Sequence, residues 1–174
     1  MKQFLVVVDM QKDFVDGALG TPEAVAIVPK VAEKIDNFYG DIFVTYDTHF
    51  DDYMQTNEGK YLPVPHCIKG SLGWHLDLKV RMALEGKRYL SVQKMTFGSV
   101  ELPELIREAA GEEPFTVELI GLCTDICVVS NALILKANFP QMEIIVDSSC
   151  CAGVTPQSHE AALTTMRMCQ IQVR

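Results

Sequence analysis

Short apolar runs alternate along the chain with segments whose apolar residues recur at helical spacing. Residues 4–8 are apolar at every position, as expected for a parallel strand that is buried on both faces. After Thr21-Pro22-Glu23, a typical helix start with threonine as N-cap, apolar residues recur at helical spacing as far as Ile35. Six strands are predicted, at residues 4–8, 41–46, 88–93, 115–120, 143–146 and 170–173.

The segments between these strands mostly predict helices. Such alternation favours an α/β fold with a parallel sheet and right-handed crossovers. Residues 47–75 differ, because they show no clean period and contain three histidines, and we interpret them as a functional loop. No linker, internal repeat or low-complexity segment interrupts the pattern, so we expect a single domain over residues 1–174. Helices are predicted at about 22–35, 76–84, 102–110, 124–137 and 156–168.

Composition narrows the class of protein and its partners. Hydrophobic residues make up 48% of the 174 residues, which is enough for a substantial core and excludes a disordered chain. A net charge of −8 argues against nucleic acid and anionic membrane surfaces as partners, since both attract basic proteins. No apolar stretch is long enough to cross a membrane. The six cysteines come without a secretory signal, so we expect them to be reduced and the protein to be cytoplasmic.

Three reactive side chains follow three different predicted strands. Asp9 closes the first strand, Lys94 closes the third, and Cys127 follows the fourth. In parallel α/β sheets, sites form outside the carboxyl ends of the strands, so we expect these side chains to converge. We interpret Cys127 as the nucleophile of an amide-type hydrolase, with Asp9 and Lys94 as its activators.

Cys127 has the surroundings that favour a thiolate. Thr124-Asp125 is a plausible N-cap, and the free N–H groups of a helix start lower the pKa of a nearby thiol and can hold an oxyanion. Lys94 adds an opposite charge, and Asp9 can accept the thiol proton. Free cysteines are commonly buried and inert, and we expect this of the other five, which are Cys67, Cys123, Cys150, Cys151 and Cys169.

A second group of residues has the spacing of a metal site. Asp47 and His49 are two residues apart in an extended segment, so both side chains point the same way. His66 offers a third ligand, and Glu58 between them offers a fourth. Carboxylate and imidazole ligands suit one divalent ion, with zinc expected and manganese or iron as alternatives. The alternative interpretation is that these are ordinary polar groups of a loop.

Two motifs resemble a known family. Asp9-Met-Gln-Lys-Asp-Phe14 and Gly121-Leu-Cys-Thr-Asp-Ile-Cys127-Val, together with Lys94, resemble the isochorismatase-like cysteine hydrolases, whose signatures are D-x-Q-x-x-F and G-x-x-T-D-x-C-V. The resemblance runs from the first strand to the last helix. It implies a three-layer α/β fold with a six-stranded parallel sheet flanked by helices, and a catalytic triad at Asp9, Lys94 and Cys127. It also implies a cis peptide bond between Leu122 and Cys123, and an oxyanion hole made by the N–H groups of Cys123 and Cys127.

The metal residues resemble one branch of that family. Asp47-Thr-His49 with a later Pro65-His66-Cys67 resembles the nicotinamidases, in which the ion holds the pyridine nitrogen of the substrate. Some members add a glutamate from the intervening loop, which here is Glu58. Isochorismatases proper do not need this metal set. Many nicotinamidases have a stacking tryptophan where this chain has Pro63, so the substrate pocket is altered, and its walls are expected at Phe14, Phe97 and Trp74.

These observations predict a metal-dependent amidohydrolase that acts on a small carboxamide through a cysteine nucleophile. Nicotinamidase activity, which converts nicotinamide to nicotinate and ammonia, is the first expectation. The alternatives are the same chemistry on another small amide, carbamoyl or ureido compound, an isochorismatase-type hydrolase, or a non-catalytic binding member of the family. We also expect a homo-oligomer, and we expect His159, in the first turn of the last helix, to be exposed to solvent.

Overall fold

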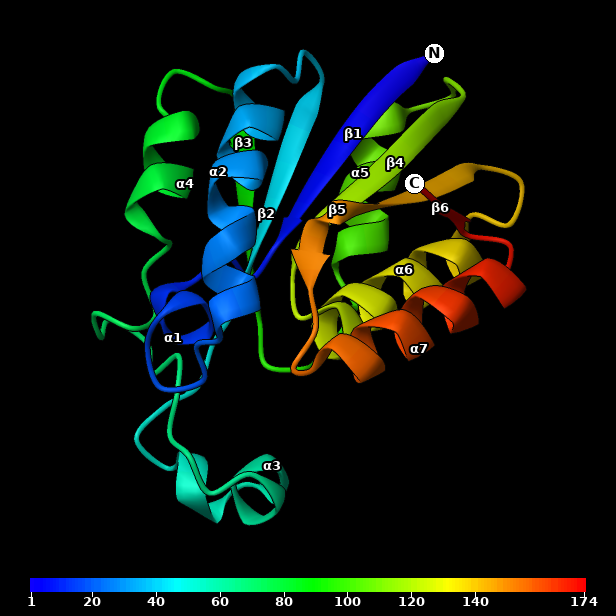
Figure 1. Ribbon diagram of the computed structural model, residues 1–174. Coiled ribbons are helices and arrows are strands. Elements are labelled where there is room, and N and C mark those ends of the chain that lie inside the picture. The colour runs from blue at the N-terminus through cyan, green and yellow to red at the C-terminus, as the bar shows by residue number, and fades with distance from the viewer.

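A single parallel sheet forms the centre of the protein. The computed structural model describes all 174 residues, and its six strands lie in the order β3-β2-β1-β4-β5-β6 (Figure 1). Every neighbouring pair is parallel, which confirms the predicted six-stranded parallel α/β fold. The strands are β1 (Lys2–Val8), β2 (Asp41–Asp47), β3 (Tyr89–Lys94), β4 (Phe115–Leu122), β5 (Glu143–Ala152) and β6 (Gln172–Val173).

Helices cover both faces of the sheet and make three layers. In Figure 1, α2 and α4 lie on one face, and α5, α6 and α7 lie on the other. The helices are α1 (Lys12–Val15), α2 (Pro22–Asp36), α3 (Asn57–Tyr61), α4 (Leu78–Ala83), α5 (Leu102–Ala110), α6 (Val129–Asn138) and α7 (Pro156–Met168). A 3₁₀ turn, η1 (Tyr53–Gln55), precedes α3, and a π-helical turn, η2 (Thr124–Val128), leads into α6. No helix combines the length and the apolar character that a membrane span requires.

The continuous apolar run of β1 has a direct structural cause. Phe4, Val6 and Val8 pack with α5, α6 and α7, whereas Leu5 and Val7 pack with α2 and α4. All five side chains are at most 1% exposed. A fully buried apolar side chain stabilises the fold by roughly 1.5–3 kcal/mol, so β1 contributes strongly to the core on both faces of the sheet.

The helix starts follow the predicted capping chemistry. Thr21 caps α2 by accepting the Ala24 N–H, and proline occupies the first turn. Thr155 caps α7 through a reciprocal pair of hydrogen bonds with Ser158. A side-chain cap of this kind contributes about 1 kcal/mol, which explains why both Thr-Pro patterns locate a helix start correctly.

The largest error in the predicted strands is at β5. The prediction ended this strand at residue 146, before the polar Asp147-Ser-Ser, whereas β5 continues to Ala152. The pairing passes from Leu119–Val146 to Gly121–Cys151, so the extra residues lie in β5, which bypasses the polar stretch and pairs with β4 again beyond it. The last predicted strand is also shorter than expected, because Gln170 adopts a left-handed φ of 62° and only Gln172–Val173 pairs.

The segment interpreted as a loop contains short helices. Residues 47–75 include η1 and α3, which lie below the carboxyl edge of the sheet in Figure 1. The four-residue helix α1 was not predicted at all. Helices of four or five residues are too short to show a helical period, so the sequence pattern could not identify them. Both helices lie at the edge where the strands carry the predicted site residues.

Candidate active site

A buried ion pair joins the ends of β1 and β3. Lys94 Nζ lies 2.6 Å from Asp9 Oδ2, and neither side chain is more than 1% exposed. Thr45 of β2 donates its hydroxyl to Asp9 Oδ1 over 2.6 Å. Lys94 Nζ also donates to Cys127 Sγ at 3.5 Å. The structure therefore brings together the three residues that the sequence placed at separate strand ends.

The ion pair keeps Lys94 charged, and burial makes Asp9 a better base than an ordinary aspartate. Burial lowers the pKa of Lys94, but the negative charges of Asp9 and Asp47 oppose this, and the pKa is raised. Burial raises the pKa of Asp9, the charge of Lys94 opposes this, and Asp47 adds to it, so the pKa lies above that of an ordinary aspartate. The result is a buried ammonium beside a carboxylate that accepts a proton more readily than usual.

The pKa of Cys127 moves in the direction opposite to our prediction. Burial raises the pKa of this thiol well above its usual range, the charge of Asp9 raises it further, and Lys94 only partly compensates. The prediction of a lowered pKa was wrong because it counted the helix start and the ammonium but not complete burial beside a carboxylate. Cys127 is therefore a neutral thiol at rest, next to a base that can take its proton.

The helix that carries Cys127 also begins differently from the prediction. Cys123 occupies the N-cap position of η2, and no side chain caps this turn. Asp125 instead accepts a backbone N–H from the loop between β5 and α7, with 3.1 Å to each carboxylate oxygen. Thr124 Oγ1 lies 2.8 Å from Nδ1 of His159. The predicted Thr124-Asp125 cap is wrong, and so is the expected exposure of His159, whose side chain is only 18% exposed.

The turn between β4 and η2 lies against the end of β1. Gly121 has a φ of 119°, and a Cβ there would lie 2.2 Å from the carbonyl oxygen of Val8, so only glycine fits. The following Leu122–Cys123 peptide bond is cis, as the family resemblance implied. The N–H of Cys123 donates to no acceptor in the protein. It is therefore free to bind a group in the cavity.

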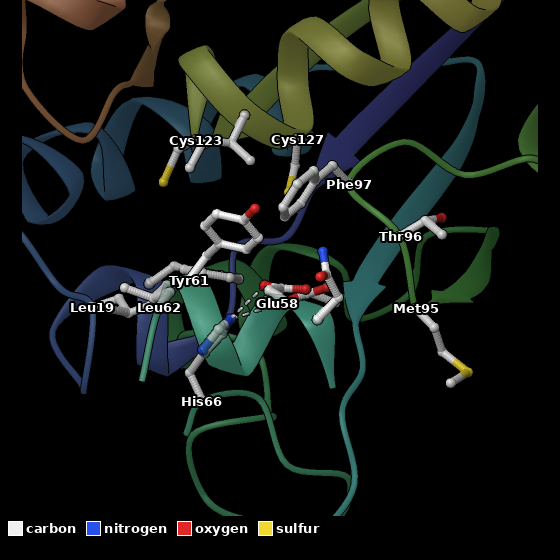
Figure 2. Close-up of a pocket in the computed structure, with 14 residues that line it drawn as sticks. Leu19, Glu58, Tyr61, Leu62, His66, Met95, Thr96, Phe97, Cys123 and Cys127 are labelled. Atoms are coloured by element: carbon white, nitrogen blue, oxygen red, sulfur yellow. Dashed lines mark ion pairs between the residues drawn. The ribbon is translucent and has the colours of Figure 1, made fainter. Parts of the chain in front are cut away.

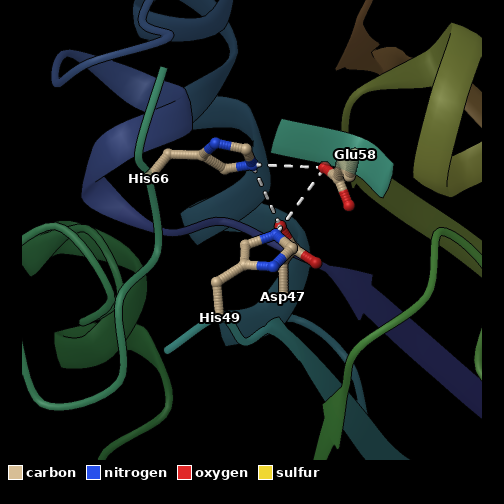
Figure 3. A group of neighbouring side chains, drawn as sticks. All are labelled: Asp47, His49, Glu58 and His66. Atoms are coloured by element: carbon tan, nitrogen blue, oxygen red, sulfur yellow. Dashed lines mark hydrogen bonds and ion pairs between the residues drawn. The ribbon is translucent and has the colours of Figure 1, made fainter. Parts of the chain in front are cut away.

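Four potential metal ligands meet beside this cluster. Asp47, His49, Glu58 and His66 each offer one ligand atom, and these atoms all lie within 4.8 Å of one another (Figure 3). Asp47 Oδ2 lies 3.0 Å from His49 Nε2 and 3.4 Å from His66 Nε2. Glu58 Oε1 lies 3.7 Å and 3.6 Å from the same two nitrogens. Two imidazoles and two carboxylates that face one point fit a single divalent ion.

The surroundings hold these ligands in place. Gln11, which is fully buried, donates to the Asp47 carbonyl and accepts the Asp47 N–H, both over 2.8 Å. His66 Nδ1 bonds to the Val64 carbonyl over 2.8 Å, which leaves Nε2 facing the group. The Tyr53 ring packs edge-on against both imidazoles. Such supporting contacts are typical of metal sites, because they fix the tautomer and the orientation of each ligand.

The charges of the group are coupled. Burial opposes ionisation of Asp47, but hydrogen bonds from His49 and His66 outweigh it and hold its pKa below the usual range. Burial lowers the pKa of His66, yet its bond to Asp47 outweighs this and raises it. Burial also raises the pKa of Glu58. Asp47 lies 3.6 Å from Lys94, so the metal group and the Asp9–Lys94 pair form one electrostatic unit.

One cavity of about 560 Å³ connects the two clusters. Cys127 lies in its wall together with Glu58 and His66 (Figure 2), and Asp47 lines the cavity as well. Nine of the fourteen lining residues are hydrophobic, and none is a lysine or an arginine. A cavity of this size with a few convergent polar groups is typical of a site for a small molecule.

The predicted pocket walls are only partly correct. Phe14 and Phe97 line the cavity, as expected. Trp74 does not, because its indole N–H donates to Thr48 Oγ1 over 3.0 Å and its ring packs against Tyr46. The six cysteines are all free. Three of the five expected to be buried and inert are buried, whereas Cys123 lines the cavity and Cys169 is exposed.

Comparison with known proteins agrees with this geometry. The model of the isochorismatase domain family matches residues 3–174. The chain is a member of the isochorismatase family. A relative from Bacillus subtilis (strain 168), described as an uncharacterized isochorismatase family protein PncA, is 30% identical over 179 residues, which cover 94% of this chain and 93% of the relative.

Solved structures show the same fold. The crystal structure of nicotinamidase/pyrazinamidase PncA from Bacillus subtilis has a TM-score of 0.85 and 26% identity, and 99% of each chain is covered. The pyrazinamidase of Pyrococcus horikoshii in complex with zinc has a TM-score of 0.81 and 27% identity, with 100% of this chain and 99% of that chain covered. The predicted family is therefore confirmed.

The sequence analysis missed residues that support the site. Asn131, one helical turn after Cys127, is fully buried. Its Nδ2 donates to the Cys127 carbonyl over 2.8 Å, and its Oδ1 accepts the Ser99 N–H over 2.9 Å. It thus joins the turn that carries the thiol to the loop after Lys94. The sequence does contain a signal for this role, because Asn131 is an amide side chain four residues after Cys127 in a helix that is otherwise largely apolar.

The opposite effects of Asp9 and Lys94 on Cys127 can be tested by labelling. Asp9 raises the pKa of the thiol, so Asp9→Asn should shift the pH at which iodoacetamide alkylates Cys127 downward, by about one unit or more. Lys94 lowers that pKa, so Lys94→Ala should shift labelling to higher pH. Mass spectrometry at graded pH measures both, and circular dichroism checks the fold. Shifts in the same direction for the two variants would contradict this electrostatic description.

The role of Asn131 can be compared with that of Asn138 on the same helix. Asn138 makes the same bond to the carbonyl four residues earlier, but at the surface. Asn131→Leu leaves buried groups unpaired and should lower the free energy of unfolding by about 2–4 kcal/mol, whereas Asn138→Leu should change it by about 0.5 kcal/mol or less. Urea denaturation measures both. Only Asn131→Leu should alter Cys127 labelling, and equal effects of the two variants would refute this role.

Proposed function

We propose that the protein is a metal-dependent amidohydrolase that converts nicotinamide to nicotinate and ammonia. The observation that carries this proposal is the single cavity in which Cys127 faces the Asp47, His49, Glu58 and His66 group. In an aromatic carboxamide that also has a ring nitrogen, the thiol would attack the carbonyl carbon while the metal group holds the ring nitrogen. The structural relatives described as nicotinamidase and pyrazinamidase, at 26% and 27% identity, support the same reaction.

The proposed ion is zinc. The donor set of two imidazoles and two carboxylates suits zinc and also accepts manganese or iron. The pyrazinamidase of Pyrococcus horikoshii is in complex with zinc, which favours zinc here. Asp47, His49 and His66 would hold the ion and Glu58 would add a fourth contact. When bound, the ion supplies a positive charge that orients a ring nitrogen and polarises the amide.

Cys127, Asp9 and Lys94 would then carry out the chemistry. Asp9 takes the proton of the Cys127 thiol as sulfur forms a bond to the amide carbon. The N–H of Cys123, which has no acceptor in the protein, binds the oxyanion together with the N–H of Cys127. Lys94 stabilises the negative charge that moves between sulfur and carboxylate. The C–N bond breaks, and ammonia leaves with the proton from Asp9.

Hydrolysis of the thioester reverses these roles. A water molecule loses a proton to Asp9 and attacks the thioester carbon, which gives a second oxyanion in the same position. The C–S bond breaks, the proton held by Asp9 returns to the Cys127 sulfur, and the carboxylic acid loses its own proton to solvent and leaves as nicotinate. Asp9 thus accepts and donates one proton in each half of the reaction, which a raised pKa makes easier.

The cavity disfavours the anionic alternatives. No lysine or arginine lines it, and the nearby Lys94 is already paired with Asp9. A substrate with carboxylate groups, as in isochorismatase chemistry, would find no side-chain cation to bind them. A non-catalytic binding protein would not require the intact set of Asp9, Lys94 and Cys127. Another small neutral amide, carbamoyl or ureido compound is the second candidate, because Pro63 replaces a usual stacking ring.

Other expectations stay predictions. The cytoplasmic location and the homo-oligomer rest on the sequence interpretation alone. The six cysteines form no disulfide in the structure, which is compatible with a reducing compartment.

Replacement of the nucleophile tests the reaction. Cys127→Ala should lower ammonia release from nicotinamide at least about 100-fold, because the covalent intermediate cannot form. Cys123→Ala should have a much smaller effect, since that residue contributes its N–H, and Cys169→Ala at the surface serves as control. Ammonia release is measured in a coupled assay with added zinc. If Cys127→Ala keeps more than about a hundredth of the natural rate, Cys127 is not the nucleophile.

Metal content tests the ligand set. The purified protein should contain about one divalent ion per chain, and His66→Ala should lose most of it, because one ligand fewer weakens the chelate. His75→Ala is the matched control, since His75 is exposed and outside the group. Glu58→Ala should weaken binding less than His66→Ala. Elemental analysis gives the stoichiometry, and a metal-free protein with full activity would contradict the metal-dependent mechanism.

A further inference from the structure

The cavity has an inner polar part and an outer apolar part. The inner part contains Cys127, Asp47 and His66, which are at most 4% exposed. The outer part is lined by exposed, uncharged side chains, which include Tyr61, Leu62 and Phe97. Figure 2 shows the Tyr61 and Phe97 rings on the Cys127 side of the cavity. We call this pair the aromatic collar.

Both side chains of the aromatic collar are exposed to solvent. Tyr61 is 86% exposed and Phe97 is 49% exposed, and neither ring packs against another aromatic ring of the protein. The Tyr61 hydroxyl makes no hydrogen bond, whereas that of the buried Tyr53 donates to the Leu62 carbonyl over 2.8 Å. When a ligand covers such aromatic side chains, their apolar surface is removed from water, and this stabilises the complex.

The fold holds the aromatic collar in position relative to the site. Tyr61 and Glu58 are three residues apart on α3, so they share one face of the helix and reach the same cavity. Thr56 caps this helix by accepting the Gly59 N–H over 3.0 Å. On the other side, Phe97 lies three residues after Lys94, in the loop that Asn131 holds through the Ser99 N–H. The collar is thus connected to both clusters of the site.

The cavity is also larger than nicotinamide requires. A cavity of about 560 Å³ is of the size that drug-sized ligands occupy, and nicotinamide, with about nine non-hydrogen atoms, is smaller than such a ligand. With its ring nitrogen at the metal group and its carboxamide at Cys127, it fills the inner part. The outer part then remains open, and its walls carry no charge that would require a polar substituent.

We infer that the preferred substrates are aromatic carboxamides that carry an apolar substituent on the ring, which the Tyr61 and Phe97 rings cover. This inference rests on the proposed amidohydrolase function and specifies its substrate class. Tyr61 and Phe97 are specificity-determining residues here, because they contact the substituent and not the reacting carbon. An apolar group that enters such a pocket changes kcat/KM by about 10- to 200-fold per methylene-sized contact.

The test compares nicotinamide with derivatives that carry a methyl, ethyl or phenyl group at each open ring carbon. In the zinc-loaded natural protein, the best substituted amide should have a kcat/KM at least about 10-fold above that of nicotinamide. Tyr61→Ala should reduce this ratio toward one, and Tyr61→Phe should keep it, because the ring and not the hydroxyl makes the contact. Tyr39→Ala is the matched control, since Tyr39 is 95% exposed at the opposite end of the sheet, beside the start of β2.

Equilibrium binding separates this inference from the proposed function. Calorimetry with zinc-loaded Cys127→Ala, which lacks the nucleophile, should show the substituted amide binding at least about 10-fold more tightly than nicotinamide, and Tyr61→Ala in that background should remove the difference. If nicotinamide is hydrolysed but every substituted amide is slower and binds more weakly, the inference is refuted and the function stands. If no amide releases ammonia yet the binding preference holds, the function fails and the collar is supported.

Discussion

The buried ion pair between Asp9 and Lys94 is the interaction on which the site depends. It joins the ends of β1 and β3 across β2, and Thr45 of β2 adds a hydrogen bond to the same carboxylate. Loss of one partner from such a pair leaves an uncompensated buried charge, which costs about 3–5 kcal/mol. The pair therefore couples the stability of this edge of the sheet to the charge that Cys127 experiences.

The same electrostatic unit reaches the metal group. Asp47 ends β2, beside Lys94 in the register of the sheet, and lies 3.6 Å from its ammonium. Its second oxygen faces the two histidines, so one carboxylate contributes to both clusters. Because β2 lies between β1 and β3, the parallel sheet itself sets the distance between the Asp9–Lys94 pair and the metal group. This arrangement lets one small molecule contact both.

Much of this site could be predicted because its residues occupy strand ends. Asp9, Lys94 and the four metal ligands were identified from alternation, spacing and motif resemblance, and the structure brings each set together. The prediction that Trp74 lines the pocket was wrong, because nothing in the sequence shows that its indole bonds to Thr48 instead of facing the cavity. The prediction of a lowered pKa for Cys127 was wrong for a related reason, since the burial that raises this pKa depends on how all the elements pack. The short helices α1 and α3 were missed because four or five residues cannot show a period.

The sequence by itself determined the alternation of strands and helices along the chain and the residue types available for chemistry. Local patterns suffice for this, because periodicity, caps and strand-end residues are properties of neighbouring positions. Only the tertiary structure decided which side chains share the cavity and how buried each one is. Asn131 and Tyr61 illustrate this, since one is buried against the Cys127 turn and the other stands open at the cavity. Desolvation and long-range contacts depend on the whole packed chain, so no local pattern contains them.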